Sequence, residues 1–139
     1  MAVFEILNGP NVDKTGSRET DIYGNENIFE FFDNLVQSYS EHKIESGFYN
    51  SEADFILALQ NSKADFLILN PGAYTHTSLA IADAVRMVQK PIGEVHISNI
   101  YTRESIRQSS LISEFVQTVI SGAGLMGYKL AIDYFLSLR

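Results

Sequence analysis

Three polar side chains, Glu94, His96 and Ser98, alternate with the apolar residues Val95 and Ile97. Residues two apart lie on the same face of an extended strand, so these three groups would lie side by side. A carboxylate beside a histidine fixes the imidazole tautomer and raises its basicity, which suits proton transfer. A half-exposed strand with its polar face toward water gives the same alternation, so the pattern alone leaves both interpretations open.

Polar groups also follow three of the apolar blocks that read as strands, at residues 8–11, 70–73 and 96–99. The carboxyl ends of parallel strands meet at one edge of a sheet, where open α/β sheets bind their ligands. The amides, the histidine and the serine in these segments therefore predict a ligand cleft. His76, just ahead of an expected helix, would either face this cleft or cap that helix.

The segment from about residue 12 to 26 has no apolar periodicity and is longer than a usual connection from strand to helix. It carries Arg18 and Tyr23, with Gly16 and Gly24 placed where hinges could swing. This arrangement predicts a lid over the cleft. A solvated loop in which Tyr23 merely packs its ring on the domain is the alternative.

Apolar blocks of strand length alternate with longer segments of helical periodicity, which predicts βαβ units. The block at residues 66–69 is apolar on both faces, as in a central parallel strand covered by helices. We expect a single catalytic domain over residues 1–139, an α/β flavodoxin-like three-layer sandwich with a five-stranded parallel sheet of order 2-1-3-4-5. The five strands are expected at residues 3–7, 44–49, 66–69, 92–97 and 115–120.

Helices are expected between these strands. The clearest runs from about residue 27 to 42, with Asn27 as its cap and His42 at its carboxyl end, where a cation suits the helix dipole. Others begin near Ser51, after residues 75–78 and after Gly124. The last helix is apolar on more than one side, which indicates contact with another subunit as well as with the sheet.

Composition excludes several classes of protein. The 139 residues carry 17 acidic and 10 basic side chains, a net charge of −7, and no basic run, which argues against a nucleic-acid partner. The absence of cysteine removes disulfides, thiol nucleophiles and cysteine-bound metals. Glu5 interrupts a possible signal peptide, and no segment approaches the roughly 18 apolar residues of a membrane span. We therefore expect a cytoplasmic protein that does not bind a membrane.

Two motifs suggest cofactors, and the sequence favours neither. Residues 122–127 match G-x-G-x-x-G, but no acidic residue follows at about 20 positions to hold a ribose, so a tight turn is the better interpretation. Glu94, His96, His76 and Asp83 do not have the spacing of a metal site. We therefore expect no cofactor and no metal.

Taken together, the motifs resemble those of type II 3-dehydroquinate dehydratases, in the family's order and over nearly the whole chain. This resemblance implies the flavodoxin-like fold, no cofactor, and a dodecamer built as a tetramer of trimers. It also implies the reaction, the dehydration of 3-dehydroquinate to 3-dehydroshikimate by anti elimination through an enolate, in the shikimate pathway or in quinate breakdown. The motifs that carry it are residues 6–11, 16–24, 68–78 and 94–99, Arg103-Glu104, Arg107, and residues 122–128.

The resemblance implies roles for the groups that move protons. Tyr23 would be the general base that removes the C2 proton, with Arg18 on the same loop stabilising its phenolate. His96, oriented by Glu94, would protonate the departing C1 hydroxyl, and Asn11 would hold a water against the enolate oxygen. An ordinary tyrosine has a pKa near 10, so basicity at pH 7 needs about 4 kcal/mol of help. One charge pair at about 4 Å supplies about that amount at an effective dielectric near 20.

The resemblance also implies the substrate contacts. The carboxylate would bind Asn70, the backbone amides of Ile97 and Ser98, and the Ser98 hydroxyl, whereas His76 and Arg107 would hold the ring hydroxyls. Asp83 would reach a neighbouring subunit's site, so the trimer would be part of the active site.

The sequence departs from the family pattern around the lid. Thr20 stands where the family has a proline, which should loosen the lid, and Lys14 and Thr15 replace two leucines. Tyr101 replaces a frequent histidine. None of these changes removes an expected catalytic group. Two other functions remain open at this stage: a module that binds a nucleotide or flavin through its glycine-rich turns, and a non-catalytic relative kept for assembly or for binding small acids.

Overall fold

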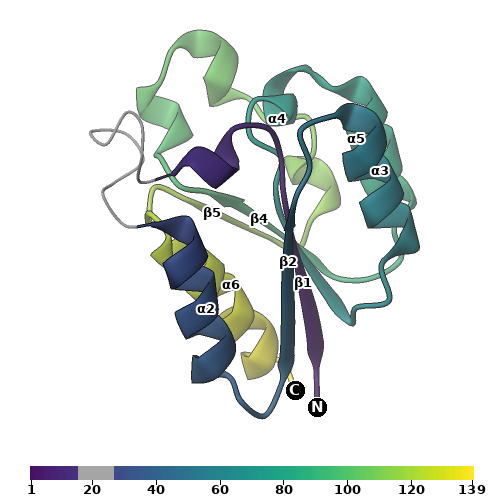
Figure 1. The fold of residues 1–139 in the computed structure, drawn as a ribbon. Coiled ribbons are helices and arrows are strands. Elements are labelled where there is room, and N and C mark those ends of the chain that lie inside the picture. Colours follow the sequence, from purple (N-terminus) through teal and green to yellow (C-terminus); the bar gives the residue numbers. More distant parts are fainter. Residues whose placement is uncertain (16–26) are drawn as a thin grey trace.

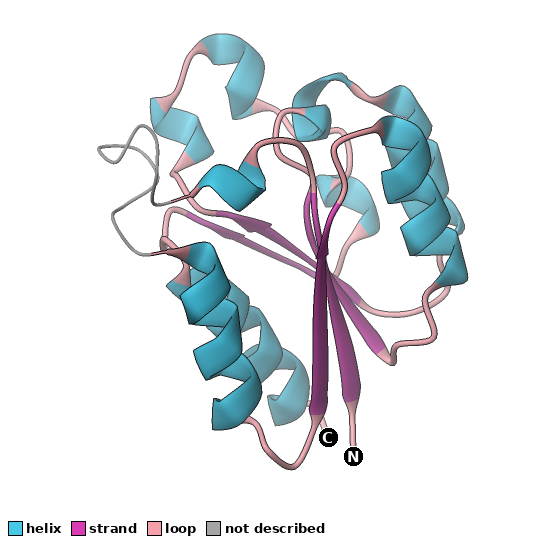
Figure 2. Ribbon diagram, in the orientation of Figure 1, coloured by secondary structure: helices cyan, strands magenta, loops and turns pink. Residues whose placement is uncertain are grey.

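The computed structural model describes residues 1–15 and 27–139 (Figure 1). One parallel sheet forms the middle layer, with helices α2 and α6 on one face and α3 and α5 on the other (Figures 1 and 2). The strand order is β2-β1-β3-β4-β5, which confirms the predicted order 2-1-3-4-5 and the flavodoxin-like fold.

The five strands are β1 (Val3–Asn8), β2 (Lys43–Phe48), β3 (Phe66–Asn70), β4 (Ile92–His96) and β5 (Thr118–Ser121). The register pairs Asn8 with Asn70, so the ends of β1 and β3 lie side by side. All neighbouring strands are parallel, so the polar segments that follow them gather at one edge of the sheet.

The start of the fifth strand differs from the prediction of residues 115–120. Residues Ser113–Phe115 form a 3₁₀ turn (η4), and the first backbone hydrogen bond to β4 comes from Gln117. The Phe115 ring packs against the core beneath α3 and α5, with the Arg86 guanidinium 5.8 Å from its centroid. Phe115 is therefore partly buried by packing against this cluster rather than by strand pairing.

The helices are α2 (Ile28–Ser38), α3 (Glu52–Asn61), α4 (Tyr74–Thr77), α5 (Leu79–Met87) and α6 (Met126–Ser137). Three begin at side-chain caps, because Asn27, Ser51 and Ser78 accept hydrogen bonds from backbone N–H groups of the first turn. The expected caps at Asn27 and Ser51 are confirmed.

The first helix is shorter than the predicted span of residues 27–42. It ends at Ser38, and a turn closed by the His42 N–H and the Tyr39 carbonyl leads into β2. His42 therefore does not stand at the helix end. Its Nδ1 accepts a hydrogen bond of 3.0 Å from the backbone N–H of Ala2, which ties the start of β2 to the amino terminus.

Two apolar clusters hold the three layers together. Phe4, Ile68 and Phe135 pack on the side of α2 and α6, whereas Leu67 and Leu69 pack on the side of α3 and α5. The strand β3 is thus apolar on both faces, as predicted for a central strand. Within residues 1–15 and 27–139, no helix is long and apolar enough to cross a membrane.

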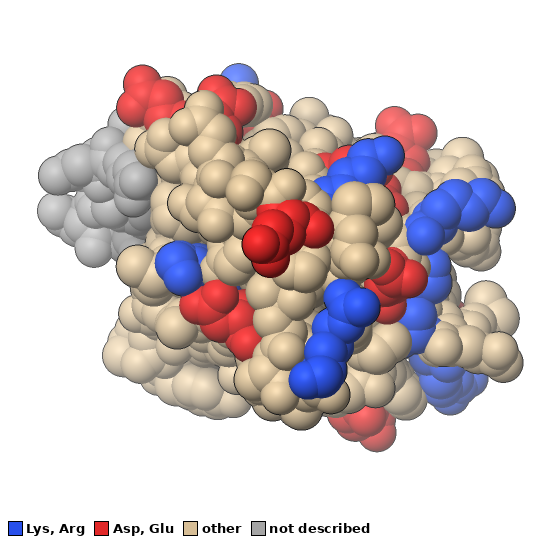
Figure 3. Space-filling view, turned by 90° about the horizontal axis from the view of Figure 1, so that it is seen from below, with Lys and Arg blue, Asp and Glu red and all other residues tan. Residues whose placement is uncertain are grey.

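Charged side chains of both signs cover the end of the molecule where the termini lie. Figure 3 shows Lys and Arg interspersed with Asp and Glu on this face. Opposite charges that lie close together partly cancel each other's field, so both signs contribute to the potential on the described part of this face.

Close backbone contact at Gly9 brings the turns after β1 and β3 together. The Gly9 N–H donates a hydrogen bond of 2.7 Å to the Asn70 carbonyl. A Cβ added at Gly9 would lie 2.0 Å from the Pro71 carbonyl oxygen, and a backbone atom cannot move aside as a flexible side chain does. Glycine is required here by the close approach rather than by its backbone angles.

We expect Gly9→Ala to destabilise the protein by about 1–3 kcal/mol, because the methyl group forces the two turns apart. Gly124→Ala is the comparison, since it has a φ of 63° and no heavy atom within 4 Å of its added Cβ. That change carries the backbone cost alone, about 1 kcal/mol. Urea unfolding of both variants measures the two losses, and an unchanged unfolding free energy in Gly9→Ala would show that the Gly9 turn shifts without cost.

Candidate active site

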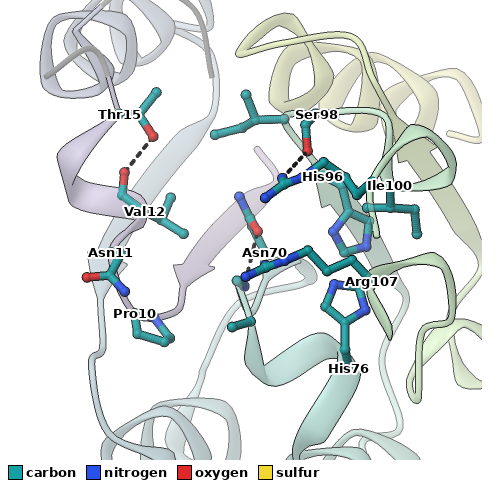
Figure 4. A pocket seen from close by; sticks show the side chains of 14 residues that line it. Pro10, Asn11, Val12, Thr15, Asn70, His76, His96, Ser98, Ile100 and Arg107 are labelled. Carbon is teal, nitrogen blue, oxygen red and sulfur yellow. Dashed lines mark hydrogen bonds between the residues drawn. The ribbon is translucent and has the colours of Figure 1, made fainter. Parts of the chain in front are cut away.

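A pocket opens at the carboxyl ends of the strands, where the sequence predicts a cleft (Figure 4). The turn after β1 forms one side, with Asn11 and the short helix η1 (Val12–Lys14). The opposite side comes from α4, the end of β4 and the loop that follows it. The predicted site residues that line this pocket are Asn11, Asn70, His76, His96, Ile97, Ser98 and Arg107.

Of the other four predicted site residues, two are described and do not line it, and two are not described. Arg18 and Tyr23 lie outside the described residues, as does most of the predicted lid. Glu94 lies behind His96, and Asp83 is exposed on α5. In residues 1–15 and 27–139, no three His, Cys, Asp or Glu side chains gather closely enough to hold a metal ion.

The pair of Glu94 and His96 is buried at the end of β4. Every residue of this strand is buried, so the alternative of a half-exposed strand is wrong. The His96 Nε2–H donates to one carboxylate oxygen of Glu94, and the Ser113 hydroxyl donates to the other at 2.6 Å. The ring nitrogen that does not contact Glu94 is Nδ1, so the pair fixes the tautomer as predicted.

Glu94 remains charged although its side chain is fully buried. Burial raises the pKa of this carboxyl, but the hydrogen bond and the charge of His96, with hydrogen bonds from Ser113 and Ser110, lower it by more, so the pKa lies below its ordinary value. A carboxylate held in this way stabilises a proton on the adjacent imidazole. The arrangement can therefore serve a general acid at His96.

His76 lies inside the short helix α4, so it does not cap a helix; Ser78 caps α5 instead. Its ring is 6.2 Å from the His96 ring, and its Nδ1–H donates to the Ser109 carbonyl at 2.7 Å. Burial lowers the pKa of His76, and the nearby His96 and Arg107 lower it further, against the opposing effect of Ser109. A neutral His76 can accept a hydrogen bond from a hydroxyl at Nε2.

The predicted tight turn at residues 122–124 orients the backbone at the end of β4. The N–H groups of Gly122 and Gly124 donate to the carbonyls of His96 and Ile97, at 3.1 and 3.0 Å. In a trans peptide unit the N–H points opposite to the carbonyl of the preceding residue. The carbonyls of His96 and Ile97 face this turn, so the N–H groups of Ile97 and Ser98 point away from it. Both residues line the pocket, which makes this amide pair suited to an anion.

Arg103 is a pocket residue to which the sequence analysis assigned no role. It lines the pocket, and its Nη1 donates to the Ser98 hydroxyl at 3.0 Å. The available signal was its place in the Arg103-Glu104 motif, which carries the family resemblance without identifying a contact. Ser113 and Tyr128 were also missed as supports of the site, because their partners lie far away in the sequence.

The sheet-end pocket and its buried carboxylate–histidine pair define an α/β enzyme equipped for proton transfer. A family model described as "Dehydroquinase class II" matches residues 2–136. The chain belongs to this family, the type II 3-dehydroquinate dehydratases.

Individual relatives agree with this assignment. A 3-dehydroquinate dehydratase of Bacillus subtilis is 41% identical over 141 residues, which cover 99% of this chain and 95% of the relative. The crystal structure of a type II dehydroquinase from Butyrivibrio crossotus matches with a TM-score of 0.90 and 36% identity, over 97% of both chains. Another from Propionibacterium acnes gives 0.89 and 34%, over 99% of this chain and 97% of the other.

We expect His76 to make stability depend on pH. The folded protein holds its pKa below the ordinary 6.5, so below that pH the unfolded chain binds more protons. Above pH 6.5 His76 is neutral in both states, so its titration does not affect stability. As the pH falls through 6.5 toward the lowered pKa, protonation of His76 in the unfolded chain destabilises the fold. His76→Gln should therefore lose less unfolding free energy than the unmodified protein between about pH 7.5 and 5.5. Denaturant unfolding across this range checks it, and parallel curves would contradict it.

Proposed function

We propose that this pocket dehydrates 3-dehydroquinate to 3-dehydroshikimate by anti elimination through an enolate, without a cofactor. The observation that carries the proposal is the buried pair of Glu94 and His96, which opens on a pocket rich in hydrogen-bond donors. The established family supports the same reaction. Hydroxide is a poor leaving group, so the elimination needs a group that can protonate it.

His96 is the general acid in this proposal. Tyr23 removes the C2 proton as its phenolate, and Arg18 stabilises that phenolate. The electrons of the C–H bond move into an enolate whose oxygen faces a water held by Asn11. Collapse of the enolate expels the C1 hydroxyl, which takes a proton from His96 and leaves as water. Glu94 stabilises the imidazolium before this transfer.

The substrate carboxylate binds where the pocket offers donors. The amides of Ile97 and Ser98, the Ser98 hydroxyl and the Asn70 side chain form this end of the site. The orientation of the two amides, set by the turn at residues 122–124, supports the assignment. His76 and Arg107 hold the ring hydroxyls. They lie on one side of His96, and Ser98 lies on the other (Figure 4).

The active form is a dodecamer, a tetramer of trimers, in the cytoplasm. Asp83 completes the site of a neighbouring subunit. Its exposure on α5, away from the pocket of its own chain, supports a role in a neighbour rather than in its own subunit.

Removal of either proton-transfer group should lower kcat strongly. We expect His96→Ala and Tyr23→Phe each to reduce kcat by about 10²–10⁴-fold, the usual contribution of a general acid or base. The ultraviolet absorbance of the conjugated product measures the rate directly. His42→Ala and Tyr39→Phe are matched controls, because neither residue lines the pocket. Full activity of either catalytic variant would contradict its role, and binding without turnover by the unmodified protein would contradict the reaction.

Mixed oligomers test the role of Asp83. Asp83→Ala and His96→Ala should each be nearly inactive alone, but co-assembled subunits should regain activity. In a random mixture about a quarter of the sites would combine an intact His96 with a neighbour's intact Asp83. Product formation by co-expressed, purified oligomers measures the rescue. If Asp83 acted within its own subunit, mixing would restore nothing.

A further inference from the structure

Tyr128 places a polar group inside the apolar core next to the pocket. This side chain of α6 is fully buried, and it is the largest such residue of those the structure describes. Burial raises the pKa of its hydroxyl, against a smaller lowering by Asn70, so the hydroxyl stays protonated at any physiological pH. A protonated hydroxyl both donates and accepts a hydrogen bond, and Tyr128 does both.

The hydrogen bonds around this hydroxyl have a fixed direction. Asn8 donates through Nδ2 to the Gly47 carbonyl at 3.2 Å, so its Oδ1 faces Tyr128. The Tyr128 hydroxyl donates to that oxygen at 2.6 Å, which leaves its lone pairs for Asn70. Asn70 Nδ2 therefore donates to Tyr128 at 2.8 Å.

The other end of the Asn70 amide fits the same direction. Its Oδ1 accepts the Gly72 N–H at 3.3 Å. Asn70 lies in the middle of the pocket view, between the turn that carries Asn11 and the end of β4 that carries His96 (Figure 4). One N–H of its amide is used by Tyr128, and the second is available to a ligand in the pocket.

We propose that Tyr128 is a positioning residue that sets which atom Asn70 presents to the substrate. An asparagine amide has nearly the same shape when its oxygen and nitrogen exchange places, so packing alone does not choose between them. The lone pair of the Tyr128 hydroxyl accepts a hydrogen bond from the amide N–H of Asn70, whereas it would be repelled by the amide oxygen. A flipped Asn70 would turn an oxygen toward the substrate carboxylate, where two acceptors repel each other. The inference rests on the proposed contact between Asn70 and that carboxylate.

The kinetic signature of this role is weaker substrate binding without a loss of chemistry. Tyr128→Phe keeps the ring and removes the hydroxyl, so Asn70 keeps the weaker contact with the Gly72 N–H but loses the shorter of the two hydrogen bonds that select its orientation. We expect KM to rise about tenfold, the equivalent of one hydrogen bond to a charged group, with kcat within about threefold. A purely structural role would lower the melting temperature and leave KM unchanged.

Tyr39→Phe is the matched control. The Tyr39 hydroxyl also donates one hydrogen bond, to Asp133, and accepts one, from Lys129, but these contacts join α2 to α6 outside the pocket. We expect this variant to keep its KM. A rise in KM equal to that of Tyr128→Phe would overturn the proposal.

A double-mutant cycle separates the positioning role from the proposed role of Asn70. Asn70→Ala should raise KM at least as much as Tyr128→Phe, and Tyr128→Phe should add nothing in the Asn70→Ala background. An unchanged KM in Asn70→Ala would show that the assigned carboxylate contact is wrong. A raised KM in Asn70→Ala with an unchanged KM in Tyr128→Phe, or effects that simply add, would show that Tyr128 does not act through Asn70.

Asn8→Ala provides a second route if Tyr128→Phe fails to fold. Asn8 does not line the pocket, and its loss frees the Tyr128 hydrogen to turn toward Asn70. The amide would then be drawn into the flipped orientation, and KM should rise about tenfold here as well. An unchanged KM in a folded Asn8→Ala protein would overturn the proposal.

Discussion

The protein keeps a charged carboxylate where no water reaches it. Glu94 is fully buried, and desolvation alone would drive it to the neutral form. The imidazole of His96 and the hydroxyl of Ser113 each donate to one of its oxygens, and with the charge of His96 and a further contribution from Ser110 they outweigh the cost of burial. The proposed acid chemistry depends on this balance, since a neutral Glu94 would no longer stabilise a proton on His96. The 3₁₀ turn that displaces the start of β5 carries Ser113, so a local irregularity of the fold supplies one of the donors to Glu94.

The parallel sheet determines where such a pair meets a substrate. Strands β1, β3 and β4 end at the same edge, so amide, imidazole and guanidinium groups from distant segments face one pocket. Backbone contacts help to hold two of the loops at this edge in place. Gly9 lies against Pro71, and the glycines of the turn at residues 122–124 bind the last carbonyls of β4. Glycine is used at these points to bring peptide groups close together, which is why a pattern resembling a nucleotide loop occurs here without its partner residues.

Much of this architecture can be predicted from the sequence. Periodicity gives five strands, right-handed crossovers favour their order, and the caps Asn27 and Ser51 have the spacing of helix starts. The shared face of Glu94 and His96 follows from strand geometry. One error arises where an apolar residue has more than one place to pack: Phe115 packs against the cluster beneath α3 and α5, although its neighbours suit a strand. The supports of the site are also beyond such patterns, because Tyr128 and Asn8 are 120 positions apart.

Asn11 shows how strictly one position can be constrained. Its backbone has a φ of 68°, the left-handed region that most side chains avoid, and its amide borders the pocket. Glycine would adopt this conformation more easily but would bring no amide. Aspartate tolerates it too, yet it would set a negative charge against the enolate of the proposed reaction. The stereochemical demand and the electronic demand overlap in a single amino acid, so variation at this site should be almost nil however far the surrounding surface diverges.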